Sequence, residues 1–308
     1  MRISSIDIGT NTILMLVADI EGDGILRPVR DEHVIARLGR GVDAHRRITP
    51  ETMSRALATL KEYKRLAESH RTDRIIAGGT SALRDAVNRE EFIAAVHEQT
   101  GIRIDVLTGD EEAELTYQGA VSEFSSRGSE ARFAVLDIGG GSTELSMGAG
   151  SKLQSRMSLD IGSVRLTERL LRGSPPKEEH LEEAKKYLQG VVSRYPILGS
   201  QDTLIGVAGT LTTLASIDLD LPDYDRTNVS GHKMALATVQ KIFDELRTKN
   251  LEELLAYPQI LKGRADILLA GILILLEVMR QTQAREVTAS DRGLRYGMAL
   301  KESSKLKV

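Results

Sequence analysis

The sequence contains no cysteine and no tryptophan, and aromatic residues make up only 4% of its 308 positions. Without cysteine, the chain can form neither a disulfide framework nor a thiolate metal site, and redox chemistry by thiols is excluded. Its expected setting is therefore a reducing cytoplasm. The six histidines show no close spacing of the kind that binds metal, so no histidine metal site is predicted.

Long apolar runs are also absent. The apolar run ILLAGILILL at residues 267–276 is the main candidate for a membrane-spanning helix. It lies between Asp266 and Glu277 and is well short of the about 20 residues that such a helix needs. It predicts a buried core helix, and no membrane partner is expected. The N-terminal segment is interrupted by Asp7, Gly9 and Asn11, so it is interpreted as mature protein and not as a signal peptide.

An excess of positive charge is the third feature that the chain lacks. It has 41 Lys and Arg against 44 Asp and Glu, a formal net charge of −3. No global basic field marks it as a nucleic-acid binder, so nucleic acid is not an expected partner. Its hydrophobic content of 41% is ordinary for a globular protein, and its length suits two domains.

The predicted elements alternate between strands and helices. Early strands are predicted at residues 3–9, 12–19 and 29–38. Helices are expected to begin after three N-caps, which are Thr49 followed by Pro50, Asn88 in a capping box with Glu91, and Asp110. The same alternation continues to the end of the chain and predicts α/β layers.

A polar loop, SSRGSEA at residues 125–131, is the predicted domain boundary. The expected domains are residues 1–127 and 128–308. A last helix at about 293–308 can pack back on the first domain.

Two short segments repeat each other. SIDIGTNTILML at residues 5–16 and VLDIGGGSTELSM at 135–147 both contain an apolar strand, Asp, Ile, Gly, a small polar turn and a second strand. One such segment would be an ordinary hairpin. Two copies, each opening a comparable α/β half, indicate a functional repeat.

The composition of these turns suits anion binding. Glycines let the backbone approach a ligand closely, successive amide N–H groups form a positive concavity, and hydroxyls add donors. Two such turns facing each other across a cleft can clamp a phosphoryl chain. Asp7, Asp137 and Glu144 add hard oxygens suited to Mg²⁺ or its bound waters.

With these motifs the whole chain resembles the exopolyphosphatase and guanosine pentaphosphate phosphohydrolase (Ppx/GppA) family. The resemblance rests on the order and spacing of IDIGTNTILMLV, GTSALRDAVN, LTGDEEAELTYQGA, LDIGGGSTEL, VAGTLTTLAS and GRADILLAGILIL. It implies two actin-like domains (ribonuclease H-like, of the ASKHA superfamily) flanking a central cleft. It also implies a metal-dependent phosphoanhydride hydrolase that uses Mg²⁺ or Mn²⁺, acts on polyphosphate or guanosine pentaphosphate, and forms a homodimer.

The resemblance also implies roles for individual residues. Glu112 would be the base or water-positioning residue, and Asp137 and Glu144 would serve the metal and the reacting phosphoryl group, with Asp7 supporting the metal shell. Gly209 and Thr210 match a loop that holds a nucleotide in superfamily relatives. The remaining phosphate contacts would come from Thr10, Asn11, Thr12, Arg84, Gly139, Gly140, Gly141, Ser142 and Thr143.

Each of these residues also has a purely structural interpretation. Glu112 lies in the first turn of a helix, where a carboxylate interacts favourably with the helix dipole, and Glu111 beside it can do the same. Arg84 can be an ordinary salt-bridged arginine, and Glu144 can point from a strand into solvent. Asp266, at a helix start next to a core run, is interpreted as structural.

Two departures from the family pattern bear on the substrate. Leu14 stands where relatives often carry a polar or basic residue, and the sequence ends at Val308 without the C-terminal HD-type domain of some members. Short polyphosphates are therefore the expected substrates. The alternatives are guanosine pentaphosphate hydrolysis, a small-molecule kinase of the same superfamily, and a non-enzymatic or filament-forming actin relative.

Overall fold

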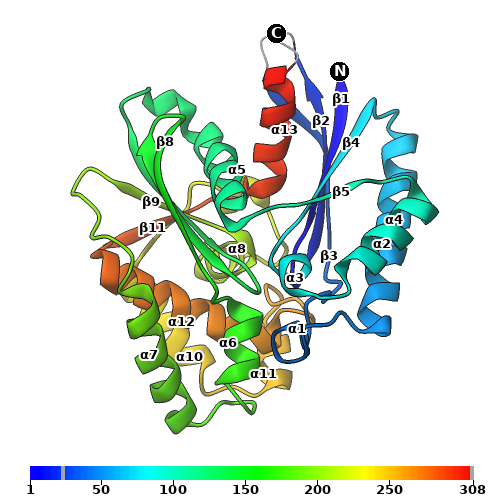
Figure 1. The fold of residues 1–308 in the computed structure, drawn as a ribbon. Helices are drawn as coiled ribbons and strands as arrows, with labels where there is room; N and C mark the ends of the chain where they lie inside the picture. The colour runs from blue at the N-terminus through cyan, green and yellow to red at the C-terminus, as the bar shows by residue number, and fades with distance from the viewer. Residues whose placement is uncertain (22–24, 306–308) are drawn as a thin grey trace. The chain divides into compact units, whose positions relative to one another are not determined.

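The structure is a computed structural model that describes residues 1–21 and 25–305. The chain divides into two compact units (Figure 1). The first unit comprises Met1–Gly119 together with the C-terminal segment from Arg292, and the second comprises Ala120–Asp291.

The first unit is built on a five-stranded sheet with the order β3-β2-β1-β4-β5. The strands β1, β2 and β3 are antiparallel neighbours, whereas β4 and β5 continue from β1 in parallel. Their bounds are β1 (Arg2–Ile8), β2 (Ile13–Ile20), β3 (Leu26–Val34), β4 (Arg74–Gly79) and β5 (Ile104–Val106).

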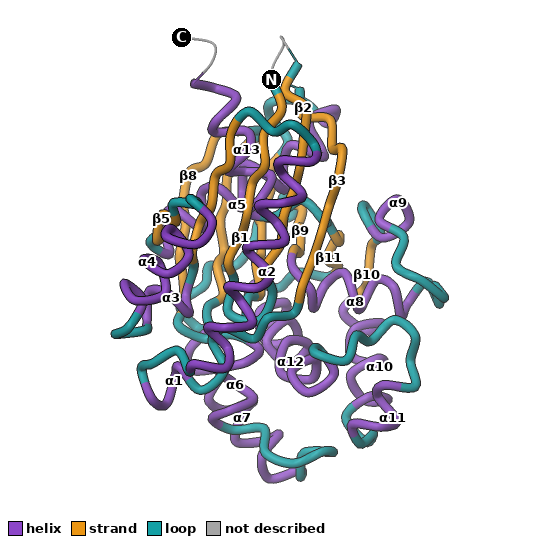
Figure 2. Tube along the Cα trace, turned by 90° about the vertical axis from the view of Figure 1, so that its right-hand side faces the viewer, coloured by secondary structure: helices purple, strands orange, loops and turns teal. Residues whose placement is uncertain are grey.

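Helices cover both faces of this sheet. Figure 1 shows α2 and α4 on one side of it and α13 on the other, and Figure 2 shows α2 running along the strands. The prediction that Thr49 caps α2 with Pro50 behind it is confirmed, because the Thr49 side chain accepts from the amide of Thr52. The helices of this unit are α1 (Val42–His45), α2 (Pro50–Ser69), α3 (Ser81–Asp85), α4 (Arg89–Thr100), α5 (Gly109–Val121), whose last two residues belong to the second unit, and α13 (Leu294–Ser304).

The second unit is built on a six-stranded sheet with the order β10-β11-β9-β6-β7-β8. Again one strand, β6, has an antiparallel pair of strands on one side and a parallel neighbour on the other. The bounds are β6 (Arg132–Ile138), β7 (Thr143–Ala149), β8 (Lys152–Leu159), β9 (Thr203–Val207), β10 (Lys233–Ala235) and β11 (Glu286–Ala289).

The order of the strands shows that the internal repeat extends beyond the two short segments. In the first sheet the order β3-β2-β1-β4-β5 has the same connectivity as β8-β7-β6-β9-β11 in the second. The two repeated segments are the hairpins β1–β2 and β6–β7, in which Ile8 pairs with Ile13 and Ile138 pairs with Thr143.

The apolar segment at residues 267–276 lies in a buried helix of the second unit, as predicted. It belongs to α12, which packs against its neighbours α6, α7 and α10. No helix within residues 1–21 and 25–305 is long and apolar enough to cross a membrane. The helices of this unit are η1 (Ser122–Arg127), α6 (Ser163–Arg169), α7 (Glu178–Val192), α8 (Ala208–Asp218), α9 (Arg226–Val229), α10 (Leu236–Leu246), α11 (Leu251–Leu255) and α12 (Ala265–Thr282).

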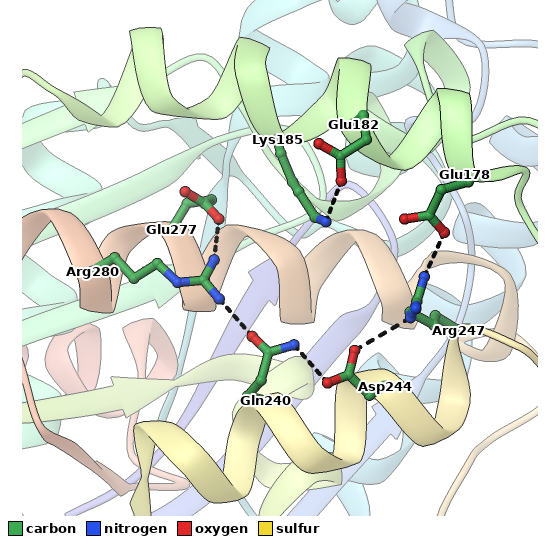
Figure 3. A network of polar contacts seen from close by, with 8 residues as sticks. All are labelled: Glu178, Glu182, Lys185, Gln240, Asp244, Arg247, Glu277 and Arg280. Carbon is green, nitrogen blue, oxygen red and sulfur yellow. Dashed lines mark hydrogen bonds and ion pairs between the residues drawn. The ribbon is translucent and has the colours of Figure 1, made fainter.

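A polar network on the helical layer ties α7, α10 and α12 together (Figure 3). Its anchor is Glu277, a buried carboxylate on α12 that accepts from Arg280. A buried carboxylate needs such a cationic partner to be tolerated. From Arg280 the contacts continue through Gln240 and Asp244 to Arg247, which pairs with Glu178 on α7.

Three sequence predictions are corrected by the structure. The first unit ends at Gly119 and not at residue 127, because η1 packs with the second unit, where Phe124 contacts Phe133. The strand predicted at 29–38 is β3 at Leu26–Val34. The helix predicted at 293–308 is α13, whose α-helical part ends at Ser304, and its last three predicted residues lie outside the described residues.

The helices α5 and α13 touch backbone to backbone through glycines. A Cβ atom at Gly297 would lie 1.8 Å from the carbonyl oxygen of Leu115, and one at Gly119 would lie 2.3 Å from that of Gly293. We therefore expect Gly297→Ala to lower the free energy of unfolding by about 1–3 kcal/mol or more, as overpacked sites do. Chemical denaturation would measure this change.

The matched control is Gly190→Ala on α7. A Cβ atom at Gly190 would meet no atom within 4 Å, so alanine there should stabilise the helix by about 0.5–1 kcal/mol. Equal stability of the two variants would contradict the close helix contact.

Candidate active site

The first predicted phosphate turn closes the hairpin β1–β2. The amide of Gly9 donates to the carbonyl of Thr12 at 3.0 Å. The next two carbonyls of the turn point into the protein. Those of Thr10 and Asn11 accept from the amides of Gly39 and Arg37, both at 2.8 Å. The turn is therefore held by the loop that follows β3.

The second predicted phosphate turn has the same geometry. The amide of Gly139 donates to the carbonyl of Ser142 at 3.0 Å. Here the carbonyls of Gly139 and Gly140 accept from the first amides of α6, those of Ser163 at 2.9 Å and Val164 at 2.8 Å. Two unrelated segments of the chain thus each hold two consecutive turn carbonyls, and one equivalent position, that of Thr10 and Gly140, is held in both turns.

These bonds determine which way the turn amides face. In a trans peptide unit the C=O and N–H groups point in opposite directions. Because the turn carbonyls point into the protein, the amides of Asn11 and Thr12 in one turn, and of Gly140 and Gly141 in the other, point away from it. Successive amides in such a concave turn form an anion-binding nest.

The hydroxyl of Thr143 does not share this outward orientation. It is fully buried and donates to the carbonyl of Ile161 at 2.6 Å. A phosphate contact from Thr143 would therefore have to come from its backbone.

The predicted metal carboxylates Asp137 and Glu144 lie directly opposite each other in the ladder of β6 and β7. Opposite residues of an antiparallel pair have Cβ atoms about 4.5–5.5 Å apart on one face of the sheet. Glu144 is only 1% exposed, so it does not point into solvent, and its Oε1 accepts from the Ser158 hydroxyl at 2.7 Å. In the first hairpin the residue opposite Asp7 is Leu14, so no carboxylate pair forms there.

The Asp137–Glu144 pair fits a divalent metal ion. Like charges placed directly opposite each other destabilise a sheet unless a cation lies between them. Mg²⁺ is commonly bound by one or two carboxylates, several waters and substrate phosphates, so two carboxylates are a sufficient donor set. No group of three or more acidic or histidine side chains that could hold a metal occurs in the described part of the chain. Asp7, the third predicted metal residue, lies in the first unit.

Glu112 and Arg84 form a buried ion pair in the first unit. Arg84 Nη1 donates to Glu112 Oε2 at 2.5 Å and to the carbonyl of Leu107 at 3.0 Å. Arg84 comes from α3, which begins beside the first turn because the amide of Thr80 donates to the carbonyl of Ile8. Burial raises the pKa of Glu112 above its ordinary value, while the charge and hydrogen bond of Arg84 lower it.

The structure distinguishes Glu112 from its neighbour Glu111. Glu111 is exposed and forms a capping box with Thr108, whose amide donates to Glu111 Oε2 at 2.9 Å while the Glu111 amide donates to Thr108 Oγ1 at 3.2 Å. The predicted cap, Asp110, is therefore wrong. Glu111 therefore has the structural role of capping the helix, whereas the Glu112 side chain faces inward and is only 7% exposed.

We expect Arg84→Met to move the acid limb of the pH profile of kcat/KM to higher pH. A general base must be ionised, so the rate falls as pH drops through its pKa. Removing the guanidinium removes the influences that lower the pKa of Glu112 and leaves the burial that raises it. An acid limb that stays in place while the rate falls would show that Glu112 does not control this ionisation.

Gly209 and Thr210 lie in the first turn of α8, directly after β9. A Cβ atom at Gly209 would lie 2.6 Å from the guanidinium carbon of Arg264. Nη1 of the same arginine donates to the carbonyl of Gly209 at 3.3 Å and to Thr213 Oγ1 at 2.9 Å. Burial lowers the pKa of Arg264. The GRADIL motif had directed attention to Asp266, so Arg264 was missed.

The predicted residues fall into two sets within the two units. The first unit contains Arg84 paired with Glu112, and the turn that follows Asp7. The second contains the turn 139–142, the opposed pair Asp137 and Glu144, and the Gly209 turn. Ser158 and Tyr195, whose hydroxyl donates to the carbonyl of Thr143 at 2.7 Å, were not predicted.

Residues 16–306 match the model of the Ppx/GppA phosphatase family. The chain belongs to this family. It is therefore a hydrolase that acts on phosphoanhydride bonds, and its α/β fold is the actin-like fold of the ASKHA superfamily. The resemblance inferred from the sequence motifs is confirmed.

Three relatives define the similarity. The chain is 35% identical to exopolyphosphatase 2 of Mycobacterium tuberculosis, across 97% of this chain and 98% of that protein. The crystal structure of the Aquifex aeolicus family member superposes with a TM-score of 0.84 at 33% identity, covering 100% of this chain and 99% of that chain. Identity to a guanosine-5'-triphosphate,3'-diphosphate pyrophosphatase of Photobacterium profundum is 29%, across 99% of this chain and 60% of that protein.

Proposed function

We propose that the protein is an exopolyphosphatase, which removes terminal phosphate stepwise from inorganic polyphosphate with Mg²⁺ or Mn²⁺. The observation that carries this proposal is the buried Glu112, ion-paired with Arg84 beside the first phosphate turn. The full-length similarity to a mycobacterial exopolyphosphatase supports the choice of substrate.

Each group of residues has a task in this reaction. The outward amides of the two turns and the guanidinium of Arg84 hold phosphoryl oxygens. Asp137 and Glu144 would hold the divalent ion, which when bound neutralises charge on the phosphoryl group. Glu112 accepts a proton from water as the new P–O bond forms, the phosphoanhydride P–O bond breaks, and the shortened polyphosphate departs.

Guanosine pentaphosphate is the second candidate substrate. The turn at Gly209 and Thr210 favours it, because a glycine at a helix start is suited to holding a nucleotide phosphate. The similarity to the Photobacterium protein supports it as well.

The test is phosphate release from long polyphosphate, short polyphosphate and guanosine pentaphosphate at matched concentrations of terminal phosphate. We expect the highest kcat/KM with short polyphosphate, since a net charge of −3 provides no general attraction for a long polyanion. A higher kcat/KM for guanosine pentaphosphate would replace the first proposal with the second.

The family resemblance also supports a homodimer, which light scattering would detect.

A further inference from the structure

A buried tyrosine holds each of the two phosphate hairpins at the same backbone atom. In the first unit, the Tyr63 hydroxyl donates to the carbonyl of Ile13 at 2.9 Å. In the second unit, the Tyr195 hydroxyl donates to the carbonyl of Thr143 at 2.7 Å. Both tyrosines are 2% exposed. Ile13 and Thr143 are equivalent, because each is the first strand residue after its turn and pairs with the isoleucine that precedes the turn.

The two tyrosines reach this atom from different local structures. Tyr63 lies within α2, whereas Tyr195 lies beyond the end of α7, where its amide donates to the carbonyl of Val192 and its carbonyl accepts from Gln281. Two dissimilar segments therefore deliver a rigid phenol to one equivalent carbonyl. The shared contact is therefore not a by-product of similar helices.

The carbonyl that Tyr195 holds belongs to the peptide unit between Thr143 and Glu144. Because this unit is planar, fixing its oxygen also fixes the amide nitrogen of Glu144 and the direction in which its side chain leaves the strand. Ser158 holds the other end of the same residue through Oε1. In the first hairpin the corresponding peptide unit leads to Leu14, which has no carboxylate to orient.

We infer that Tyr195 is a positioning residue for Glu144, and that it orients the carboxylate which, with Asp137, would hold the divalent ion. This inference rests on the metal-dependent function proposed above. Tyr63 makes the same bond in the first unit but supports only the phosphate turn there. Groups that hydrogen-bond a metal ligand directly typically change metal affinity by about 10- to 100-fold when removed, and Tyr195 acts on Glu144 through one peptide unit.

The repeat supplies its own control for the experiment. Tyr195→Phe and Tyr63→Phe each remove one hydroxyl from a buried carbonyl and should lower the thermal midpoint similarly. If the bonds were merely structural, the two variants would bind metal equally well. Tyr187→Phe is the second control, since Tyr187 is a half-buried residue of α7 whose hydroxyl accepts from Arg169 and not from a phosphate hairpin.

The measurement is Mn²⁺ binding by the full chain without substrate. Electron paramagnetic resonance of the free Mn²⁺ ion monitors the binding. We expect Tyr195→Phe to raise the Mn²⁺ dissociation constant by about 10-fold, and Tyr63→Phe and Tyr187→Phe to leave it unchanged. Circular dichroism verifies that each variant is folded. If Tyr195→Phe does not fold, Ser158→Ala tests the same arrangement and should weaken Mn²⁺ binding likewise.

Native Mn²⁺ affinity in folded Tyr195→Phe, or in Ser158→Ala where it replaces that variant, would overturn the inference. Equal weakening in Tyr63→Phe would overturn it too, as would wild-type protein that binds no Mn²⁺. Because substrate is absent, the result is separate from the proposed function. Wild-type protein that fails to release phosphate but shows the expected Mn²⁺ pattern would contradict only the exopolyphosphatase proposal.

Discussion

Glu112→Gln is expected to lower kcat by about 10²- to 10⁴-fold, the usual contribution of a general base. Glutamine keeps the size of the side chain and can still contact Arg84, but it cannot accept a proton from water. KM should therefore change little. Steady-state phosphate release with the proposed substrates measures both constants.

Glu111→Gln is the matched control. Glu111 is the neighbouring acid, it is exposed, and its contact with Thr108 is a capping box in which glutamine also serves. We expect near-native kcat from this variant. A wild-type kcat in Glu112→Gln, or an equal loss in Glu111→Gln, would remove Glu112 from its proposed role.

Asp137→Asn and Glu144→Gln are expected to reduce metal-dependent turnover by more than the about 10- to 100-fold typical of groups that only support a ligand. Each substitution removes half of the opposed carboxylate pair on β6 and β7. Turnover as a function of Mg²⁺ and Mn²⁺ concentration would show the loss. Glu286→Gln, an exposed carboxylate at the start of β11 that pairs with Lys233, should leave turnover unchanged.

The same variants have a second expected effect in metal-free protein. Two carboxylates directly opposite each other repel, so neutralising one should preserve or raise the thermal midpoint when no cation is present. A large destabilisation of metal-free Asp137→Asn would contradict the electrostatic account of this pair.

The sequence was sufficient to predict the repeated hairpins because their pattern is local. Strand, aspartate, glycine turn and strand follow one another without a gap, and the register of Asp137 with Glu144 follows from a four-residue turn. The cap at Thr49 was predicted for the same reason. Asn88 had an equally good capping pattern, but its side-chain amide instead accepts from the backbone N–H of Ile48 and donates to the carbonyl of Ile48. This contact depends on the tertiary fold.

The site itself was only partly predictable. The choice between Glu111 and Glu112 had a local signal, since Thr108 and Glu111 have the spacing of a capping box. The pairing of Arg84 with Glu112 had none, because it joins two helices that follow different strands. The strand predicted through residue 38 failed because residues 37 and 39 donate to the first turn and not to a sheet partner.

The most direct test of the account is hydrolysis in ¹⁸O-labelled water with Mg²⁺ and short polyphosphate. If Glu112 activates water to attack the terminal phosphoryl group, each released phosphate should contain one oxygen from the solvent, and Glu112→Gln should release almost none. Mass spectrometry of the phosphate measures this incorporation. Released phosphate without the label, or transfer of the phosphoryl group to an acceptor other than water, would contradict the account.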